Sequence, residues 1–474
     1  MSNEIQKNNS ALKMGTMPMF RLILTMSLPS MFSMLVQACY NVVDSIYVSR
    51  LGEYALSAVS VVFPVQLLNI AVAVGTGVGL SSLISRRLGE RRYEDADSAA
   101  QHGWFLALLQ WIFFLLFGIF GSAAFCKLFS DSDLLFTSAT SYCTIVCIGS
   151  IFVMEAQCIE KIMQSTGNMM PTMWTMLAGA ITNIILDPIM IFGLLGCPAF
   201  GVAGAAYATV IGQAVTWLAG FIIMNKIKMP VKIKYKPFKL RGPIIKDIYQ
   251  VALPSMVMQA IGSVTTLCLN AILIGFSSTA VAVYGVYFKL QSFIFMPVFG
   301  MNQGLLPIMG YNYGARNKDR LMSCLKYGII IAVCIMTAGT IIFNLFPDVL
   351  MSLFKAEGDL LTVGIKCLKT ISLSFPFAAI AIIIGTLFQA TGHGIYSMII
   401  SIMRQLVVIV PLAFILSKVY GLMGIWYAYP AAEIVSLTLS LILLRKLYKS
   451  EIEHLEDGKK AKTIVEQYNA AEAK

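Results

Sequence analysis

Charged residues are scarce in this sequence: they make up 12% of the 474 residues, whereas hydrophobic residues make up 58%. An average soluble domain carries charge on about 25% of its residues. So few charges cannot cover the surface that a water-soluble chain of this length would expose. The composition therefore excludes an ordinary soluble protein and predicts one that lies within a membrane.

Residues that usually perform catalysis or hold metals are also few. The three histidines, His102, His393 and His454, lie near predicted loops or in the tail, and they form no cluster for a metal or for an acid–base enzyme. The ten cysteines are scattered mostly through apolar segments, and "CTIVC" at 143–147 has the i, i+4 spacing of helix packing. No nucleophile motif or phosphate-binding loop is present. We expect no enzyme, no cofactor and no metal other than a coupling ion.

What the sequence has instead is a series of long apolar runs. Each has roughly 18 or more residues, which is enough for a helix rising about 1.5 Å per residue to cross about 30 Å of hydrocarbon. Loop signals divide these runs into about twelve spans, which predicts an all-α integral membrane fold. The segment before the first span is polar and contains no apolar core before a small-residue cleavage site, so we expect that span to be retained rather than removed as a signal peptide.

The net charge of +11 would permit nucleic-acid binding, but the positive residues gather in alternate loops. They lie in segments 85–97, 225–246 and 315–320 and at the start of the tail. This alternation is typical of the positive-inside rule. It predicts that both termini face the cytoplasm, that the number of spans is even, and that the chain contacts membrane lipid and no nucleic acid.

An internal repeat organises the chain. "SLPSM" at 27–31 returns as "ALPSM" at 252–256, which sets a constant offset in residue number, and "GVAGAAYA" at 201–208 returns as "GLMGIWYA" at 421–428 with a shift of five residues. The same ungapped frame aligns six further pairs: Gln66 with Gln291, Gly75 with Gly300, Gly79 with Gly304, Gly89 with Gly314, Arg91 with Arg316, and Gly103 with Gly328. One short match could be chance, but one frame that runs through five helices is not.

The repeat predicts two six-helix halves. Because six is even, both halves enter the membrane in the same orientation, which predicts parallel repeats related by a pseudo-two-fold axis along the membrane normal. Transporters with this architecture carry their substrate between two bundles. We expect five segments in this order: a cytoplasmic N-terminal segment 1–19, an N-lobe bundle 20–225, a basic cytoplasmic linker 226–245, a C-lobe bundle 246–447 and a cytoplasmic tail 448–474.

A few polar residues interrupt the apolar spans, although each acid costs about 2.5 to 3.5 kcal/mol on insertion scales. In the first span they form one stripe at spacings of three, four and seven, made of Gln37, Tyr40, Asn41 and Asp44. The fifth span has an i, i+4 pair, Asn183 and Asp187, and the sixth has Tyr207, Thr209 and Gln213. Residues this costly are candidates for function.

Asp187 is followed directly by Pro188, which has no N–H for the carbonyl of Ile184 and whose ring is expected to bend the helix. A carboxylate, the amide oxygen of Asn183 and a released carbonyl are hard oxygen ligands of the kind that hold a small cation. In a dry setting the same carboxyl group can instead hold a proton near neutral pH. We predict that Asp187 is a coupling residue; the alternative is that it only hydrogen-bonds its neighbours.

The repeat partners of the two intramembrane aspartates are apolar, because Asp44 aligns with Leu269 and Asp187 with Leu412. A purely structural acid would be needed in both bundles. We therefore expect that only the amino-terminal bundle holds the ion.

Other intramembrane charges stay open at this stage. Glu155 and Glu160 approach one end of the fourth span together with Lys161, a pattern typical of an interfacial ion pair. Lys289 in the eighth span could counterbalance a cation or extend to the interface. Glu433 could face a cavity of the second bundle, and the sequence assigns it no role.

The chain resembles the multidrug and toxic compound extrusion (MATE) transporters, especially the prokaryotic branch with DinF-like and MepA-like members. The resemblance covers residues 20–447, about nine tenths of the chain. It rests on "LPSM" opening each half, "QSTGN" before the fifth helix, "NIILDPIMIFG", and "GVAGAAYATVIGQ" opening the sixth helix. It implies an antiporter of the bacterial cytoplasmic membrane that expels lipophilic, often cationic, drug-like compounds against an inward flow of Na⁺ or H⁺, and that works as a monomer.

The resemblance also implies roles for particular residues. In that branch the coupling site matches Asp44, Tyr40, Asn183, Asp187 and Thr209, and a Na⁺ ion would lie at Asp44, Asn183, Asp187 and Thr209. Accessory polar residues of the same bundle are Gln37, Asn41, Gln157 and Gln213, and the expected helix kinks are at Pro188, Pro29 and Pro254. Another branch places its essential acids on the seventh and tenth helices. On the seventh helix this sequence has the amides Gln259 and Asn270 instead, and on the tenth helix it has no acid at the matching place.

Two other functions stay open. A flippase for a lipid-linked precursor has a related architecture, but it should carry more cations in its central cavity than Lys289 alone. An intramembrane enzyme would need clustered catalytic groups, which the sequence does not have.

Overall fold

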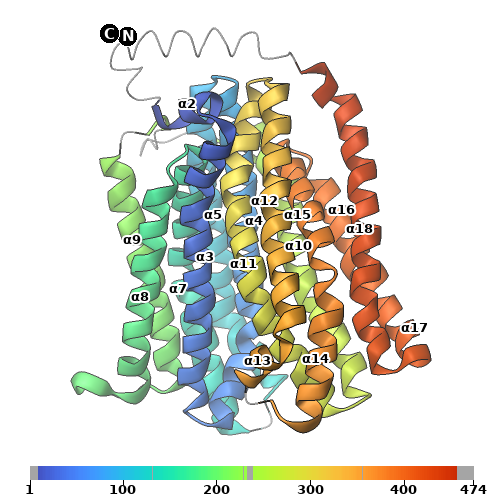
Figure 1. Cartoon of the computed structure of the whole chain (residues 1–474). Coiled ribbons are helices and arrows are strands. Elements are labelled where there is room, and N and C mark those ends of the chain that lie inside the picture. Colours follow the sequence, from blue (N-terminus) through green and yellow to red (C-terminus); the bar gives the residue numbers. More distant parts are fainter. Residues whose placement is uncertain (1–8, 131, 228, 232–238, 355, 456–474) are drawn as a thin grey trace.

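The computed structural model describes residues 9–130, 132–227, 229–231, 239–354 and 356–455 (Figure 1). These residues form helices and no strand. The first half contains α2 (Asn9–Thr16), α3 (Met19–Ser49), α4 (Glu53–Gly89), α5 (Tyr93–Leu116), η1 (Phe117–Gly121), α6 (Ser122–Lys127), α7 (Asp133–Ser165), α8 (Met169–Phe192), η2 (Leu194–Gly196) and α9 (Val202–Lys226). The second half contains α10 (Gly242–Ile274), α11 (Ser278–Gly314), α12 (Lys318–Leu345), α13 (Pro347–Ser352), α14 (Gly358–Ser372), α15 (Phe375–Ala390), α16 (Gly394–Ile402), η3 (Met403–Ile409), α17 (Val410–Tyr420), α18 (Leu422–Ser450) and η4 (Ile452–His454).

Eleven helices among the described residues are long and apolar enough to cross a membrane, and a bent pair, α14 and α15, completes a twelfth span. This confirms the predicted all-α fold with two six-helix halves. In Figure 1 the N-lobe (α3 to α9, blue to green) lies mainly on the left and the C-lobe (α10 to α18, yellow-green to red) mainly on the right. The helix α2 and, after α18, the short helix η4 lie at one end of the bundle, the upper end in Figure 1. This end is called the α2 end.

The tenth span, predicted as one helix, is broken, with 47° between α14 and α15. Pro376 lies in the first turn of α15 and has no N–H to donate to the carbonyl of Ser372, four residues earlier. That carbonyl accepts a hydrogen bond from Thr340 Oγ1 of α12 instead, at 2.8 Å. The repeat partner of Pro376 is Ile151, and α7 continues through it without a break.

Within the predicted N-terminal segment the structure has a helix, α2, that the sequence patterns did not indicate. The helices that contain Pro29, Pro188 and Pro254 each continue through the proline, and the bend expected at each of these residues stays a prediction. Residues 1–8, 232–238 and 456–474 of the predicted terminal and linker segments lie outside the described residues.

The two lobes meet along a seam of glycines near the α2 end. A Cβ added to Gly75 of α4 would lie 2.5 Å from Met256 Cγ of α10, and one added to Gly300 of α11 would lie 2.6 Å from Met31 Cα of α3. Met31 and Met256 are themselves repeat partners. The contact is therefore isologous: the same surface of each half meets the other half across the pseudo-two-fold axis.

Gly89 and Gly314 continue this seam. A Cβ on Gly89 would overlap the carbonyl oxygen of Tyr311, and a Cβ on Gly314 would overlap the carbonyl oxygen of Arg86. Arg86 and Tyr311 are also repeat partners, because the same offset in residue number separates them. Because backbone atoms cannot turn away as a side chain can, these positions require glycine for the lobes to close.

Hydrogen bonds between the lobes lie in the same half of the bundle as the glycine seam. Ser82 Oγ of α4 donates to the carbonyl of Gln389 of α15 at 2.6 Å, and Gln110 Nε2 of α5 donates to Tyr249 Oη of α10 at 3.1 Å. The inter-lobe hydrogen bonds of Ser27, Ser82, Arg87, Gln110, Lys161, Gln164 and Asn312, and the inter-lobe glycine contacts of the described residues, lie in the half of the bundle nearer the α2 end. The lobes are thus joined at that end.

Candidate ion-coupling site

Asp44 of α3 and Asp187 of α8 face each other inside the N-lobe. The two carboxyl groups are close enough to interact electrostatically, Asp187 is fully buried, and Asp44 Oδ1 is buried without a hydrogen-bond partner among the described residues. Two neighbouring carboxylates in a dry site do not both stay ionised unless a proton or a cation offsets their charge. The arrangement is therefore chemically suited to take up positive charge.

Asn183 holds Asp187 in place from one turn earlier on the same helix. With its amide oriented so that both ends are satisfied, its nitrogen donates to Asp187 Oδ2 at 3.1 Å and its oxygen accepts from the backbone N–H of Thr209 at 3.2 Å. This contact is possible because α8 and α9 approach closely: a Cβ on Gly212 would lie 2.9 Å from the carbonyl of Gly179. Thr209 thus reaches the site through its backbone.

Tyr40 of α3, one turn before Asp44, lies near enough to both carboxyl groups to interact with them electrostatically. The structure therefore brings together four of the predicted coupling residues by their side chains, Tyr40, Asp44, Asn183 and Asp187, and the fifth, Thr209, by its backbone.

Of the predicted accessory residues, Gln37, Gln157 and Gln213 make no hydrogen bond to this cluster among the side chains that the structure describes. Gln37 and Gln213 make no side-chain hydrogen bond among the described residues, and Asn41 lies outside the side chains that the structure describes. Gln157 donates to Glu160 Oε2 at 3.1 Å, in a different polar group. Their expected accessory role stays a prediction.

Two residues that the sequence patterns did not single out complete the site. Tyr142 of α7 is buried and interacts electrostatically with Asp44 and Asp187, and Gln66 Nε2 of α4 donates to its hydroxyl at 2.9 Å. Gln66 had appeared only as a marker of the repeat. The sequence could have pointed to Gln66, because it is an isolated amide in an apolar span. Nothing in the sequence around Tyr142 distinguishes it from the other tyrosines.

Replacing Tyr142 with phenylalanine is expected to lower the initial rate of ion-driven dye efflux about fivefold, since one hydrogen bond contributes about 1 kcal/mol. It also leaves the amide of Gln66 without its acceptor, so the melting temperature should fall. The double variant Tyr142→Phe, Gln66→Leu separates the two effects, because it removes the orphaned amide but not the missing hydroxyl. Recovery of stability without recovery of efflux would support a role in the site; joint recovery would contradict it.

The comparisons with known proteins identify the family of the chain. A family model described as MatE matches two segments, residues 29–189 and 254–415, whose starts are separated by the offset of the internal repeat. The chain belongs to the MatE family. It is a membrane transporter of the MATE type and not an enzyme.

Relatives of this MATE chain include a curated protein and solved structures. The multidrug export protein MepA of Staphylococcus aureus (strain MSSA476) is 27% identical over 450 residues, which cover 93% of this chain and 97% of that protein. A solved multidrug resistance MATE family transporter of the MOP superfamily, in an outward-facing conformation, has 30% identity and a TM-score of 0.87, covering 93% of this chain and 98% of its own. A MATE structure in a straight conformation has 29% identity and a TM-score of 0.88, covering 94% and 99%.

Two of the charges on the fourth span form the expected ion pair, and this pair is buried inside the protein. Glu160 and Lys161 are buried 3.9 Å apart, and Gln164 Nε2 donates to Glu160 Oε1 at 2.6 Å. Lys161 Nζ and Gln164 Nε2 both donate to Gln303 Oε1 of the C-lobe, at 3.1 and 2.9 Å. This ion pair is therefore part of the contact between the lobes of the MATE fold.

The C-lobe holds a carboxylate of its own. Glu433 of α18 is buried, and its Oε1 accepts from Arg404 Nη1 of η3 at 3.0 Å. Glu433 is thus paired with a cationic side chain of the protein, whereas no ion pair is found for Asp44 or Asp187 among the described residues. Glu155 is buried with Oε2 unpaired among the described residues, and Lys289 is exposed on α11.

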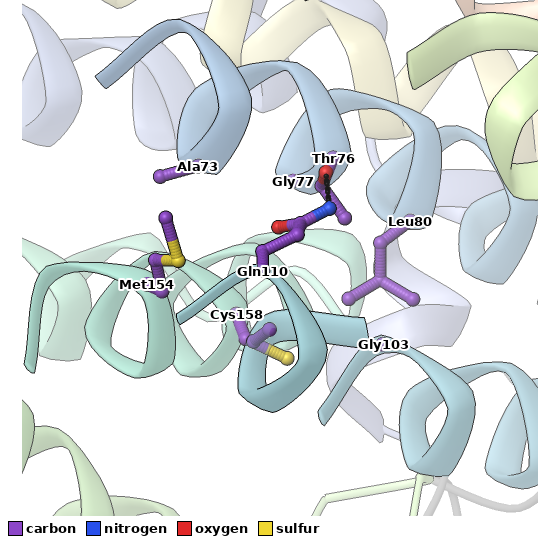
Figure 2. Close-up of a pocket in the computed structure, with 9 residues that line it drawn as sticks. Ala73, Thr76, Gly77, Leu80, Gly103, Gln110, Met154 and Cys158 are labelled. Atoms are coloured by element: carbon purple, nitrogen blue, oxygen red, sulfur yellow. Dashed lines mark hydrogen bonds between the residues drawn. The ribbon is translucent and has the colours of Figure 1, made fainter. Parts of the chain in front are cut away.

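Of two spaces in the structure, the first is too small for a drug-sized substrate and the second is a partly open, charged groove. Figure 2 shows the first, between α4, α5 and α7, where Gln110 Nε2 donates to Thr76 Oγ1 at 2.7 Å; its volume of about 10 Å³ admits at most one water molecule. The second, of about 450 Å³, lies beside the start of α10. Its three arginines, Arg87, Arg92 and Arg241, each hold a carboxylate.

Proposed function

We propose that this MATE protein is a multidrug exporter that drives lipophilic, often cationic compounds out of the cell by an inward flow of cations. The observation that carries the proposal is the pair of neighbouring carboxyl groups in the N-lobe, the fully buried Asp187 and the half-buried Asp44. The relatives named as multidrug export and multidrug resistance proteins support the substrate class. The site supplies the coupling, because the pair is stable only when positive charge binds it.

We propose H⁺ as the coupling ion in preference to Na⁺. Asn183 presents its amide nitrogen to Asp187, and an N–H group is a hydrogen-bond donor and not a cation ligand. A proton shared by the two carboxyl groups needs no further ligand, whereas Na⁺ would require that amide to turn. The tyrosine hydroxyls of Tyr40 and Tyr142 suit either ion.

The α2 end, in this proposal, faces the cytoplasm of a bacterial cell. The basic loops with Arg91, Arg92 and Arg316 lie between helices that end or begin there, in agreement with the positive-inside rule. The glycine seam then closes the cytoplasmic side. The protein would act as a monomer surrounded by lipid.

Ion and drug need not touch for one to drive the other. Each needs only to favour a different conformation of the two lobes, and the coupling free energy is the difference in those preferences. Ion uptake by the Asp44–Asp187 pair changes the charge at the contact between α3 and α8. Because α3 also packs against α11 of the C-lobe, the change reaches the contact between the lobes through α3.

Flux into proteoliposomes tests this proposal. The purified protein is reconstituted, pH and Na⁺ gradients are imposed separately, and accumulation of a fluorescent cationic dye is followed. We expect accumulation with the pH gradient alone. Accumulation with Na⁺ alone would replace H⁺ by Na⁺, and no accumulation with either gradient would reject the antiport proposal.

A flippase for a lipid-linked precursor is the alternative function. It should have a central cavity lined with free cations for a pyrophosphate. Lys289 is exposed on α11, and Lys161 is buried in contact with Glu160 and two glutamines, so the described residues offer little support for it. Scrambling of a fluorescent lipid pyrophosphate in the same vesicles would favour the flippase.

A further inference from the structure

The helix α2 lies on the lobe to which it does not belong. It precedes α3 of the N-lobe by only two residues, Met17 and Pro18, but it contacts α11 of the C-lobe. A Cβ on Gly15 would lie 3.0 Å from Tyr311 Cε1, and Met14 is fully buried. Residues 9–18 therefore form a strap, the N-terminal strap, that crosses from one lobe to the other.

Arg320 of α12 fixes the end of this strap. Its Nη2 donates to the carbonyls of Met14 at 3.1 Å and Met17 at 2.8 Å, and its Nε donates to Asn312 Oδ1 at 3.3 Å. Asn312 Nδ2 also donates to the carbonyl of Met14, at 3.1 Å. The last carbonyls of a helix have no partner within the helix, and a guanidinium group is well suited to satisfy them. Among the described residues, Arg320 has no carboxylate partner.

The second half of the chain repeats the arrangement with other chemistry. Arg241, at the end of the linker that precedes α10, contacts the N-lobe: its backbone N–H donates to His102 Nε2 at 2.9 Å, and its Nη1 lies 3.5 Å from Asp95 Oδ1. Asp95 and Arg320 are repeat partners. At equivalent positions, each lobe thus holds the segment that leads into the first helix of the other lobe.

We propose that Arg320 is a positioning residue of the transport cycle, whose hold on the N-terminal strap keeps the α2 end closed until the lobes separate there. The strap is joined to α3 by two residues, too few to let α3 leave α11 while α2 stays. Opening at this end must therefore break the hydrogen bonds of Arg320. Their strength sets how often the closed seam opens.

This inference rests on the proposed function, but its test does not need transport. Ser82 is fully buried in the seam, so in a Ser82→Cys background the thiol at position 82 reports on opening. Its modification by a maleimide is followed in lipid nanodiscs by mass spectrometry of the peptide that contains it. In that background, Arg320→Ala is expected to raise the rate at least about tenfold, since a charged hydrogen bond contributes about a factor of ten or more.

The matched control is Lys326→Ala, which removes one positive charge from the exposed face of the same helix without touching α2. It should leave the labelling rate unchanged. An Arg320→Ala protein with an unchanged melting temperature and an unchanged labelling rate would overturn the proposal. If the Ser82→Cys protein transports no dye, but Arg320→Ala still raises the labelling rate at position 82 as expected, only the proposed function is contradicted.

A second variant covers the case in which Arg320→Ala does not fold. Cysteines at positions 15 and 311, where Gly15 and Tyr311 touch, can be joined by a short bismaleimide after assembly. Cross-linking should hold the strap on α11, lower the labelling of residue 82 and stop dye transport, while the uncross-linked protein stays active. Full transport by the cross-linked protein would show that the strap need not move, and would overturn the proposal.

Discussion

Replacing Asp187 with asparagine is expected to reduce ion-driven dye efflux to the level of vesicles without protein. The amide of asparagine keeps the size of the side chain and can still bond Asn183, but it cannot take up a proton or balance a cation. Asp44 would then face a neutral group, and binding of the ion would no longer be required for stability. The measurement is dye flux in proteoliposomes under a fixed pH gradient, with the amount of folded protein checked by its melting temperature.

Asp44→Asn should behave in the same way, because the two carboxyl groups form one site. Asp133→Asn is the control: Asp133 is an exposed acid at the start of α7, and the same substitution there should leave efflux unchanged. Normal efflux from the Asp187 variant would refute the coupling site. Loss of efflux from only one of the two aspartate variants would reduce the pair to a single carrier.

Replacing Gly89 or Gly314 with alanine is expected to prevent the lobes from closing at the α2 end. Each new methyl group would overlap a backbone carbonyl of the opposite lobe, and overpacking of this kind costs about 1 to 3 kcal/mol. The closed state should then lose population by roughly a factor of ten for each 1.4 kcal/mol, and efflux should fall accordingly. Modification of a cysteine at position 82 should become faster in both variants.

The control for the glycine variants is Gly285→Ala on α11, where a Cβ would meet nothing within 4 Å. Alanine is favoured over glycine inside a helix by about 1 kcal/mol, so this variant should be as stable as the original protein or more so, with unchanged efflux. Gly89 and Gly314 are the last residues of α4 and α11 and neither has a positive φ, so alanine suits their backbone and a loss there points to the overlap with the opposite lobe. If both seam variants label and transport normally, the seam does not close in the way described.

Much of the fold could be predicted from the sequence because its determinants are local. Apolar runs of sufficient length define the spans, and the constant offset of the repeat identifies the two halves. The break between α14 and α15 was missed, although its cause, Pro376, is visible in the sequence. Proline alone does not decide the matter: α8 continues through Pro188, and the tenth span breaks where Thr340 of another helix takes the freed carbonyl.

The candidate site was predictable where its residues share a helix. Asn183 and Asp187 lie one turn apart, and so do Tyr40 and Asp44, so the i, i+4 pattern identifies each pair. That the two pairs face each other is a property of the packing of α3 against α8, which no local pattern contains. The resemblance to MATE transporters supplied that link.

The remaining parts depend on contacts between distant segments. Tyr142 of α7 joins the site through Gln66 of α4, and Arg320 of α12 holds carbonyl groups at the opposite end of the chain. The carbonyl oxygens that Arg320 contacts carry no sequence information at all. The aligned glycines were recognised as marks of a repeat, and only the structure explains why glycine is needed at six of them, because Gly75, Gly79, Gly89, Gly300, Gly304 and Gly314 each meet backbone atoms of the opposite half.

The self-complementary form of the seam bears on how such a chain could arise. Gly75 meets Met256 while Gly300 meets Met31, so a single ancestral half, before duplication of its gene, could have paired with a second copy of itself through this surface. Fusion of two copies then freed each to diverge. After fusion, one half could carry the two aspartates while the other half carries leucines at the matching positions. Two identical subunits encoded by one gene could not differ in this way.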